Sequence, residues 1–235
     1  MKIAAVVMAG GCRERFWPLS KKSLPKQFLS ILGHSSMLKQ TVDRLEGLVC
    51  PEDIYIVTLN EYKAIVLDQI PWICEDNILV EPCGRDTAAA VGLAAVEIAR
   101  RFPGAVMVML PSDHFISDTE NFIVTLKATA EAASKGDQAV TLGIPPLSPE
   151  TGYGYILKGD FYREFNGLKA HKAVKFTEKP AHEKAVEYVN SGNYFWNSGI
   201  FIWRVDLIRR LISIHLPELE EGLKAIQSAP DDTKK

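Results

Sequence analysis

A cluster of positive charge follows the first apolar segment of this chain. Between residues 9 and 26 there is one anion, Glu14, against five cations, so the segment has a local charge of +4 (five minus one). The cations are Arg13, Arg15, Lys21, Lys22 and Lys26. The whole chain has a formal net charge of −2, from 27 Lys and Arg against 29 Asp and Glu. A polynucleotide would need a much broader basic surface, so the local cluster favours a small anion such as a triphosphate.

A pair of glycines, Gly10 and Gly11, precedes this cluster and follows the apolar run Ile3–Met8. Glycine lets backbone N–H groups approach a phosphate because no Cβ stands in the way, and ligands of open α/β sheets bind where strands end. A tight turn before a solvated basic loop is the simpler alternative. We favour phosphate binding because the loop also contains residues that we expect to hold it rigid, the aromatic ones by being buried: Pro18, Pro25, Phe16, Trp17 and Phe28.

A second candidate segment runs from Glu81 to Thr87. A carboxylate suits guanine, which presents its N1–H and N2–H donors side by side, so Glu81 is the candidate for recognition of the base. Gly84 would leave room for the flat ring, and Thr87 is placed to cap the helix that follows. The alternative is a helix-capping turn with a structural Arg85–Asp86 ion pair.

A third candidate, Asp113, follows the apolar run Ala105–Leu110 in the sequence Pro-Ser-Asp-His. A carboxylate at the carboxyl end of a central strand faces the cleft and suits Mg²⁺ bound between phosphates. An aspartate turn or cap is the alternative. We expect His114 to be a neighbour of the site and not a catalytic base.

Three later segments offer groups suited to a hexose phosphate: Thr151–Ile156, Phe176–Pro180 and Trp196–Phe201. Lys179 would supply a cation for the phosphate, Glu178 and Asn197 would bind hydroxyl groups, and Gly152 would admit the ring. Taken singly, each is equally an ordinary surface or strand-end residue.

Strands and helices alternate through the first 145 residues. The predicted strands are Ile3–Met8, Ile54–Thr58, Ile78–Val80, Ala105–Leu110 and Ala139–Ile144. The predicted helices are Met37–Leu48, Tyr62–Ile70, Ala88–Arg101 and Asn121–Ser134. This alternation predicts a parallel sheet covered by helices on both faces.

The remainder is less regular. We predict strands at Tyr153–Lys158, Ala173–Thr177 and Gly199–Trp203, and helices at Ala181–Ser191, Val205–Ile214 and Pro217–Ile226. Because the chain has neither internal repeats nor a flexible linker, we expect one domain over residues 1–235. Residues 1–145 would form its nucleotide-binding half and residues 146–235 its sugar-phosphate-binding half.

The four cysteines include no C-x-x-C pair, so we expect them to be mostly free, reduced and partly buried. The amino-terminal apolar run is too short for a signal peptide, and no stretch approaches the roughly 20 apolar residues of a membrane span. These features predict a cytoplasmic protein without a membrane partner.

The motifs resemble those of the sugar-1-phosphate nucleotidyltransferases, in order, over about residues 1 to 215. Residues 10–26 resemble the signature G-G-x-G-x-R followed by Pro-Lys, and the forms W-P-L-S and P-K-Q-F-L resemble the mannose-1-phosphate guanylyltransferase branch. The segments at Glu81 and Asp113 are similar to E-P-x-G-R-N-T-A-P-A and P-S-D-H-x-I. Three positions depart from the pattern: Arg13 replaces a glycine, Asp86 an asparagine and Ala89 a proline.

The resemblance implies a Rossmann-like three-layer α/β/α fold of the nucleotide-diphospho-sugar transferase type, with a mixed, mostly parallel sheet. It implies the reaction of mannose 1-phosphate with GTP to give GDP-mannose and diphosphate, with Mg²⁺ as cofactor. Arg15, Lys26 and Asp113 would be catalytic, with Asp113 as the metal ligand. The nucleotide-binding residues would be Gly10, Gly11, Arg13, Glu81, Gly84, Arg85 and Thr87. Gly152, Glu178, Lys179 and Asn197 would bind the sugar phosphate.

Two departures leave alternatives open. Arg13 either blocks the approach of the triphosphate or adds a cation to its site. Family members usually continue into an S-I-D-Y-type segment with a second metal ligand and often a C-terminal β-helix, and this sequence includes neither. The alternatives are a relative that uses UTP or dTTP and a non-catalytic nucleotide-sugar-binding homologue. A homodimer is one assembly that the sequence allows.

Overall fold

The structure is a computed structural model that describes residues 1–11, 16–84 and 86–228. One eight-stranded sheet runs through it in the order β3-β2-β1-β4-β8-β6-β7, with β5 paired to β8. The strands are β1 (Ile3–Met8), β2 (Ile54–Leu59), β3 (Ile78–Glu81), β4 (Val106–Pro111), β5 (Val140–Ile144), β6 (Gly154–Phe165), β7 (Leu168–Glu178) and β8 (Tyr194–Arg204).

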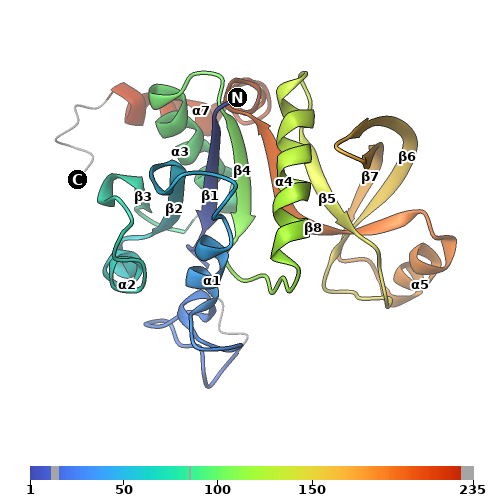
Figure 1. Ribbon diagram of the computed structural model, residues 1–235, viewed down its shortest axis with the longest axis horizontal. Coiled ribbons are helices and arrows are strands. Elements are labelled where there is room, and N and C mark those ends of the chain that lie inside the picture. Colours follow the sequence, from blue (N-terminus) through green and yellow to red (C-terminus); the bar gives the residue numbers. More distant parts are fainter. Residues whose placement is uncertain (12–15, 85, 229–235) are drawn as a thin grey trace.

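Helices cover both faces of this sheet (Figure 1). They are α1 (Met37–Asp43), α2 (Lys63–Gln69), α3 (Asp86–Arg101), α4 (Thr119–Ser134), α5 (His182–Ser191), α6 (Val205–His215) and α7 (Pro217–Ser228). The three-layer α/β/α arrangement predicted for the chain is confirmed. None of the described helices is long and apolar enough to span a membrane.

Two buried clusters form the core, one on each face of the sheet, because successive side chains of a strand point to opposite faces. Ala5 and Val7 of β1 pack with residues of α1, α2 and α4. Ala4 and Val6 pack on the other face with residues of α3 and α6. The strand is therefore apolar without interruption, as is usual for a parallel strand covered on both sides.

The sheet has a parallel and an antiparallel part. Strands β3, β2, β1 and β4 are parallel to one another, so their carboxyl ends meet at one edge. Strand β8 runs antiparallel to β4, β5 and β6, and β6 forms a long hairpin with β7. In Figure 1 the hairpin and α5 lie to the right of the parallel strands.

Several predicted boundaries were wrong, while every predicted strand and helix exists. Helix α1 ends at Asp43, not Leu48, and separate turns follow it. The strands β6, β7 and β8 are much longer than predicted. Most of β7 is exposed, so it lacks the apolar alternation by which a half-buried strand is recognised. Cys50, Cys74 and Cys83 are free, as expected, but exposed and not partly buried.

Candidate functional site

A cavity of about 380 Å³ opens where the four parallel strands end. Most of the predicted nucleotide-binding residues that the structure describes lie in its wall, although they come from distant parts of the chain. The lining includes Gly10, Gly11, Lys26, Glu81, Gly84, Thr87 and Asp113. Parallel connection of the strands brings these loops together, because every strand in such an arrangement delivers its carboxyl end to the same edge.

Lys26 and Asp113 form an ion pair on one side of this cavity. Lys26 begins a short 3₁₀ turn, Lys26–Phe28, that follows Pro25. Asp113 lies two residues beyond the end of β4. About a quarter of each side chain is exposed, so both charged groups remain accessible to a ligand in the cavity. The pair places a cation and a potential metal ligand side by side.

Gln27 fixes the backbone of the glycine loop. Its side chain is buried, and its amide Nε2 donates hydrogen bonds to the carbonyl oxygens of Ala9, at 2.8 Å, and Gly11, at 2.9 Å. The hydroxyl of Thr58 donates a further bond, at 3.1 Å, to the Ala9 oxygen. Sequence reasoning missed both residues as parts of the site. Only their positions in the sequence could have pointed to these two residues: Gln27 follows the candidate lysine, and Thr58 lies near the end of a strand.

Glu81 lines the same cavity from the end of β3, with only 8% of its surface exposed. Burial raises the pKa of its carboxyl group above the ordinary value. The carboxylate is close to the glycine loop, because a Cβ added to Gly10 would lie 3.0 Å from Glu81 Oε2. A Cβ on Gly84 would meet only Leu59, at 3.9 Å, so the space around Gly84 is open.

Thr87 was predicted to cap the following helix, and this prediction was wrong. Helix α3 begins at Asp86, so Thr87 lies within its first turn. The helix was inferred from its apolar residues, which do not show where its first turn begins. In that first turn the backbone N–H groups have no acceptor inside the helix. Thr87 lines the cavity, so the start of α3 lies at its edge, and helix starts favour bound anions.

Helix α1 positions the segment that contains Asp113. The hydroxyl of Thr41 donates to the Ser112 carbonyl oxygen at 3.3 Å, and Arg44 donates to that of His114 at 3.2 Å. Burial, aided by the charges of Arg44 and Lys26, lowers the pKa of His114, whereas Asp113 opposes that shift. The imidazole is therefore neutral at neutral pH.

The predicted sugar-phosphate residues form a second group at the start of the β6–β7 hairpin. A Cβ added to Gly154 would lie 2.7 Å from Glu178 Oε2 and 3.4 Å from Asn197 Cβ, so Glu178 and Asn197 meet over a glycine. Lys179 pairs with Glu178 at 2.9 Å. The space around Gly152 is open. Gly154 was not singled out from the sequence, although it is the glycine that this contact requires.

The two groups of residues are adjacent. A Cβ on Gly199 of β8 would lie 3.4 Å from Pro111 Cγ, and Pro111 lines the cavity. Gly199 has a φ of +72°, a conformation that favours glycine, so it permits a close approach of β8 to the end of β4. The Pro111 side of the cavity therefore adjoins β8, the strand that contains Asn197.

Comparison with known proteins agrees with this geometry. The Nucleotidyl transferase family model matches residues 4–230. The chain belongs to this family. It is 38% identical over 234 residues to a mannose-1-phosphate guanylyltransferase of Escherichia coli K12, and 40% identical over 235 residues to one of Salmonella montevideo.

The chain spans about half the length of these relatives. The match covers 98% of this chain but 48% and 49% of the two relatives, respectively. A crystal structure from Thermus thermophilus, described as mannose-1-phosphate geranyltransferase, has a TM-score of 0.88 and 36% identity, with 98% of this chain and 66% of that chain covered.

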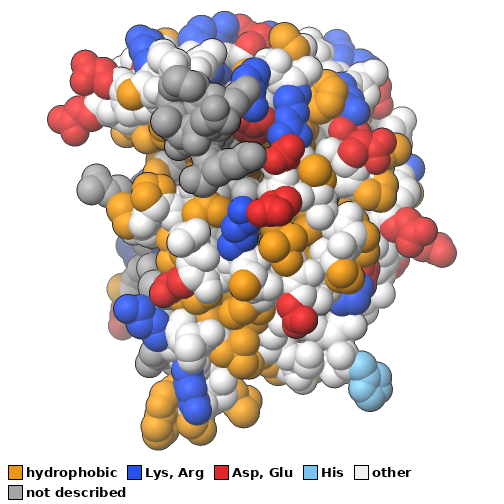
Figure 2. Space-filling model, turned by 90° about the vertical axis from the view of Figure 1, so that its left-hand side faces the viewer, with side chains coloured by type: hydrophobic (Ala, Val, Ile, Leu, Met, Phe, Trp, Pro, Cys, Tyr) orange, Lys and Arg blue, Asp and Glu red, His pale blue; other side chains and the backbone are white. Residues whose placement is uncertain are grey.

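The aromatic residues in the glycine-rich loop of this nucleotidyl transferase were predicted to be buried, and two of the three are exposed. Phe28 is buried, but Phe16 is 40% exposed and Trp17 is 73% exposed. Apolar side chains gather at the lowest part of the face shown in Figure 2, at the height where this loop projects from the body in Figure 1. The loop is held by backbone hydrogen bonds from Leu19 and Ser20 to the Phe16 carbonyl oxygen, and not by burial of Phe16 and Trp17. Arg13 and Arg85, both predicted to bind the nucleotide, and Arg15, predicted to be catalytic, lie outside the described residues.

The family's expected magnesium ion fits this donor set only as a substrate-bridging ion. Among the described residues, no group of three or more His, Cys, Asp or Glu side chains could hold a metal. Mg²⁺ usually binds through one or two carboxylates and completes its coordination with substrate phosphates and water. Asp113 at the edge of an open cavity suits that mode of binding.

Proposed function

We propose that this chain transfers a guanylyl group from GTP to mannose 1-phosphate, giving GDP-mannose and diphosphate. The observation that supports it is the meeting of Gly10 and Gly11, Lys26, Glu81 and Asp113 in one cavity beside a polar sugar-binding group. A phosphate oxygen of mannose 1-phosphate would attack the α-phosphorus of GTP. The bond from that phosphorus to the diphosphate would break, and diphosphate would leave on the opposite side.

Catalysis in this proposal is mostly positioning and neutralisation of charge. Backbone N–H groups at Gly10 and Gly11 would approach the nucleotide phosphates, and Lys26 would stabilise the negative charge of the reacting ones. Asp113 would hold Mg²⁺, which supplies further charge neutralisation when bound. No general base is required, because a sugar phosphate is already an anion at neutral pH.

Selection of guanine would depend on Glu81. Its ionised carboxylate offers two acceptor oxygens to the N1–H and N2–H donors of the base. Burial disfavours the ionised form in the free protein, and two donors from guanine would restore it. Uracil and thymine lack this pair of adjacent donors, so the carboxylate would discriminate against UTP and dTTP.

The experiment that tests the proposal is pyrophosphorolysis with diphosphate and Mg²⁺. GDP-mannose, UDP-glucose and dTDP-glucose are offered separately, and the triphosphate formed is measured. We expect GTP from GDP-mannose, while formation of UTP or dTTP in its place would assign the chain to another branch. If GDP-mannose raises the melting temperature but GTP, mannose 1-phosphate and saturating Mg²⁺ release no diphosphate, the chain is a nucleotide-sugar-binding protein.

A further inference from the structure

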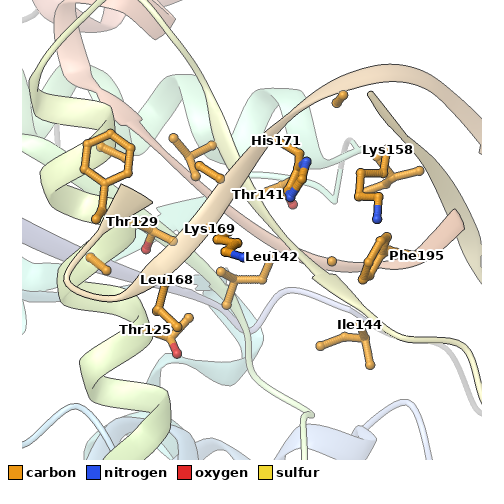
Figure 3. A pocket seen from close by; sticks show the side chains of 18 of the residues that line it. Thr125, Thr129, Thr141, Leu142, Ile144, Lys158, Leu168, Lys169, His171 and Phe195 are labelled. Atoms are coloured by element: carbon orange, nitrogen blue, oxygen red, sulfur yellow. The ribbon is translucent and has the colours of Figure 1, made fainter. Parts of the chain in front are cut away.

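The segment that contains Asp113 lies between two cavities. Pro111, Ser112 and Asp113 line the smaller one, where the parallel strands end. Residues 115–118 line a second and larger cavity, of about 890 Å³, between α4, β5 and the β6–β7 hairpin (Figure 3). Close packing fixes a segment only where other atoms surround it, so a segment with open space on two sides needs specific contacts to hold one conformation. The carboxyl end of α1 supplies two such contacts.

These two contacts hold the backbone on either side of Asp113. The Thr41 hydroxyl donates to the Ser112 carbonyl oxygen at 3.3 Å, and Arg44 Nη2 donates to the His114 carbonyl oxygen at 3.2 Å. Thr41 and Arg44 are three residues apart, so both reach the segment from one face of the helix end. Asp113 is therefore fixed between two hydrogen bonds to its neighbours.

Arg44 is a buried cation without an ion pair. Only 8% of its surface is exposed, and none of the ion pairs among the described residues includes it. Its guanidinium carbon lies 6.0 Å from the centre of the Phe122 ring on α4. Burial of a charge without an opposite charge is unfavourable. Stability alone therefore does not account for an arginine at this position, whereas its hydrogen bond to the Asp113 segment does.

The amino end of α1 holds the segment of Lys26. Ser36, which caps the helix, donates at 2.6 Å to Oε1 of Gln69, and Nε2 of Gln69 donates at 3.1 Å to the Phe28 carbonyl oxygen. Phe28 ends the short turn that begins at Lys26. A backbone N–H at the start of the helix also donates, at 3.1 Å, to the residue after that turn. One helix therefore holds both members of the Lys26–Asp113 ion pair, one at each end.

We propose that Arg44 is a positioning residue for Asp113. It holds the His114 carbonyl oxygen and thereby keeps the Asp113 carboxylate in the orientation that binds Mg²⁺, while Thr41 acts in the same way on the other side. Arg44 does not line the cavity at the strand ends, so it touches neither the metal nor the nucleotide. Loss of a residue that orients a metal ligand typically weakens metal binding by roughly 10–100-fold. The proposal rests on the proposed function in that Asp113 is taken as the magnesium ligand.

The test is calorimetry of GTP binding over a series of Mg²⁺ concentrations, without mannose 1-phosphate, so that no turnover is needed. Arg44→Met removes the donor but retains an apolar side chain of similar length beside Phe122. We expect the Mg²⁺ concentration that gives half of the gain in GTP affinity to rise about tenfold. GTP affinity in EDTA should not change, since Arg44 lies outside the cavity. Equal weakening with and without Mg²⁺ would indicate general distortion and overturn the proposal.

A double-mutant cycle shows whether the effect of Arg44 passes through Asp113. Asp113→Asn removes the proposed ligand and should abolish most of the gain in GTP affinity with Mg²⁺. In that background Arg44→Met should have no further effect on GTP affinity at a subsaturating Mg²⁺ concentration. The same loss from Arg44→Met in both backgrounds would show that it acts elsewhere.

Arg101→Met is the matched control. Arg101 also donates to a backbone carbonyl oxygen, that of Asp76 at 3.2 Å, and its guanidinium carbon lies 5.5 Å from the centre of the Tyr55 ring. It lies at the end of α3 away from the cavity. Its substitution should leave the Mg²⁺ dependence unchanged, whatever its effect on the melting temperature. A shift as large as that in Arg44→Met would overturn the proposal.

Thr41→Val tests the second hydrogen bond and replaces Arg44→Met if that variant does not fold. Valine has nearly the shape of threonine, so the change removes little more than the donor to Ser112. The Mg²⁺ dependence should shift in the same direction by about threefold, the usual effect of one neutral hydrogen bond.

The outcomes separate this proposal from the proposed function. If Mg²⁺ strengthens GTP binding to the unchanged chain but neither Arg44→Met nor Thr41→Val shifts that dependence, positioning by α1 is wrong and the guanylyltransferase function is unaffected. If the unchanged chain does not bind GTP, or binds it without any response to Mg²⁺, the function fails and the positioning role fails with it.

Discussion

Lys26 is the residue from which we expect the largest effect on turnover. Its ammonium group lies at the cavity beside Asp113, where negative charge would develop on the reacting phosphates. Lys26→Ala should lower kcat by about two to three orders of magnitude, the usual effect of removing one charge-stabilising donor. Diphosphate release measures this. The control is Lys63→Ala, which removes a surface lysine paired with Glu75 away from the cavity and should leave kcat unchanged. Near-normal activity of Lys26→Ala would exclude it from the site.

Gln27 should act on binding through the backbone that it holds. Gln27→Leu removes the donor for the Ala9 and Gly11 carbonyl oxygens, so the glycine loop loses its fixed orientation. We expect the KM for GTP to rise about tenfold, consistent with the loss of one or two hydrogen bonds, with a smaller change in kcat. Gln40→Leu is a matched control, because Gln40 also donates to two backbone carbonyls but lies outside the cavity. An unchanged KM in Gln27→Leu would show that the loop is held without it.

Glu81 should make stability depend on pH. Burial raises the pKa of its carboxyl above the ordinary value of 4.5, so the folded chain holds this proton more tightly than the unfolded chain. The contribution of Glu81 to stability is therefore most favourable below pH 4.5 and declines as the pH rises through the raised pKa. Glu81→Gln removes this decline, so its melting temperature relative to the unchanged chain should increase from pH 4.5 towards neutrality.

The same substitution should weaken binding of GDP-mannose at least about tenfold, because a carboxamide offers one acceptor where a carboxylate offers two. Thermal unfolding across the pH range and calorimetry at neutral pH measure the two effects. Glu61→Gln, at an exposed position on the surface, should change neither. A difference in melting temperature that is constant with pH would disprove the role of burial.

At the scale of elements, the sequence predicted the parallel half of the sheet closely. Strands such as Ile3–Met8 are continuous apolar runs because both faces are covered, and that pattern is distinct. The hairpin was under-predicted because β7, with residues such as Lys169 and Lys172, is mostly exposed. Local periodicity reports burial, so a strand held by pairing with little burial gives a weak signal.

The site was predictable where its chemistry was in the side chains. Glu81, Lys26 and Asp113 were singled out by their charge, their places near strand ends and their match to the family motifs, and all three line one cavity. Gln27, Thr58 and Gly154 were not singled out, because their roles depend on contacts with Ala9, Gly11 and Glu178, which only the fold creates. Phe16 and Trp17 were misjudged because residue type alone does not say which side of a loop faces the core.

Two glycines should respond in opposite directions to substitution by alanine. Gly192 ends α5 with a φ of +67°, so Gly192→Ala should lower the free energy of unfolding by about 1 kcal/mol. Gly222 lies inside α7 with open space around it, so Gly222→Ala should raise that free energy by about 0.5–1 kcal/mol. Denaturant unfolding measures both values. The same sign for both would contradict the assigned conformations.

At the scale of the whole molecule, the fold separates two kinds of ligand group. The parallel strands present the proposed phosphate- and base-binding residues at their carboxyl ends, and the antiparallel part presents Glu178, Lys179 and Asn197, the proposed sugar-phosphate residues. Positive and negative side chains are interspersed over the face seen in Figure 2, so the anion affinity must come from the local site. Strand β8 joins the two parts, since it pairs with both β4 and β6.

This arrangement predicts an ordered pattern of protection from amide hydrogen exchange. GTP with Mg²⁺ should slow amide exchange at residues 10, 11, 84, 87, 90, 112 and 113, because these residues line the cavity. Mannose 1-phosphate added afterwards should slow exchange at residues 152–155, 178–179 and 196–199. The second set should change little with GTP alone, because Pro111 and Gly199 mark the boundary between the two groups. If GTP alone protects both sets equally, the two parts respond as one unit and the division into a nucleotide half and a sugar-phosphate half is wrong.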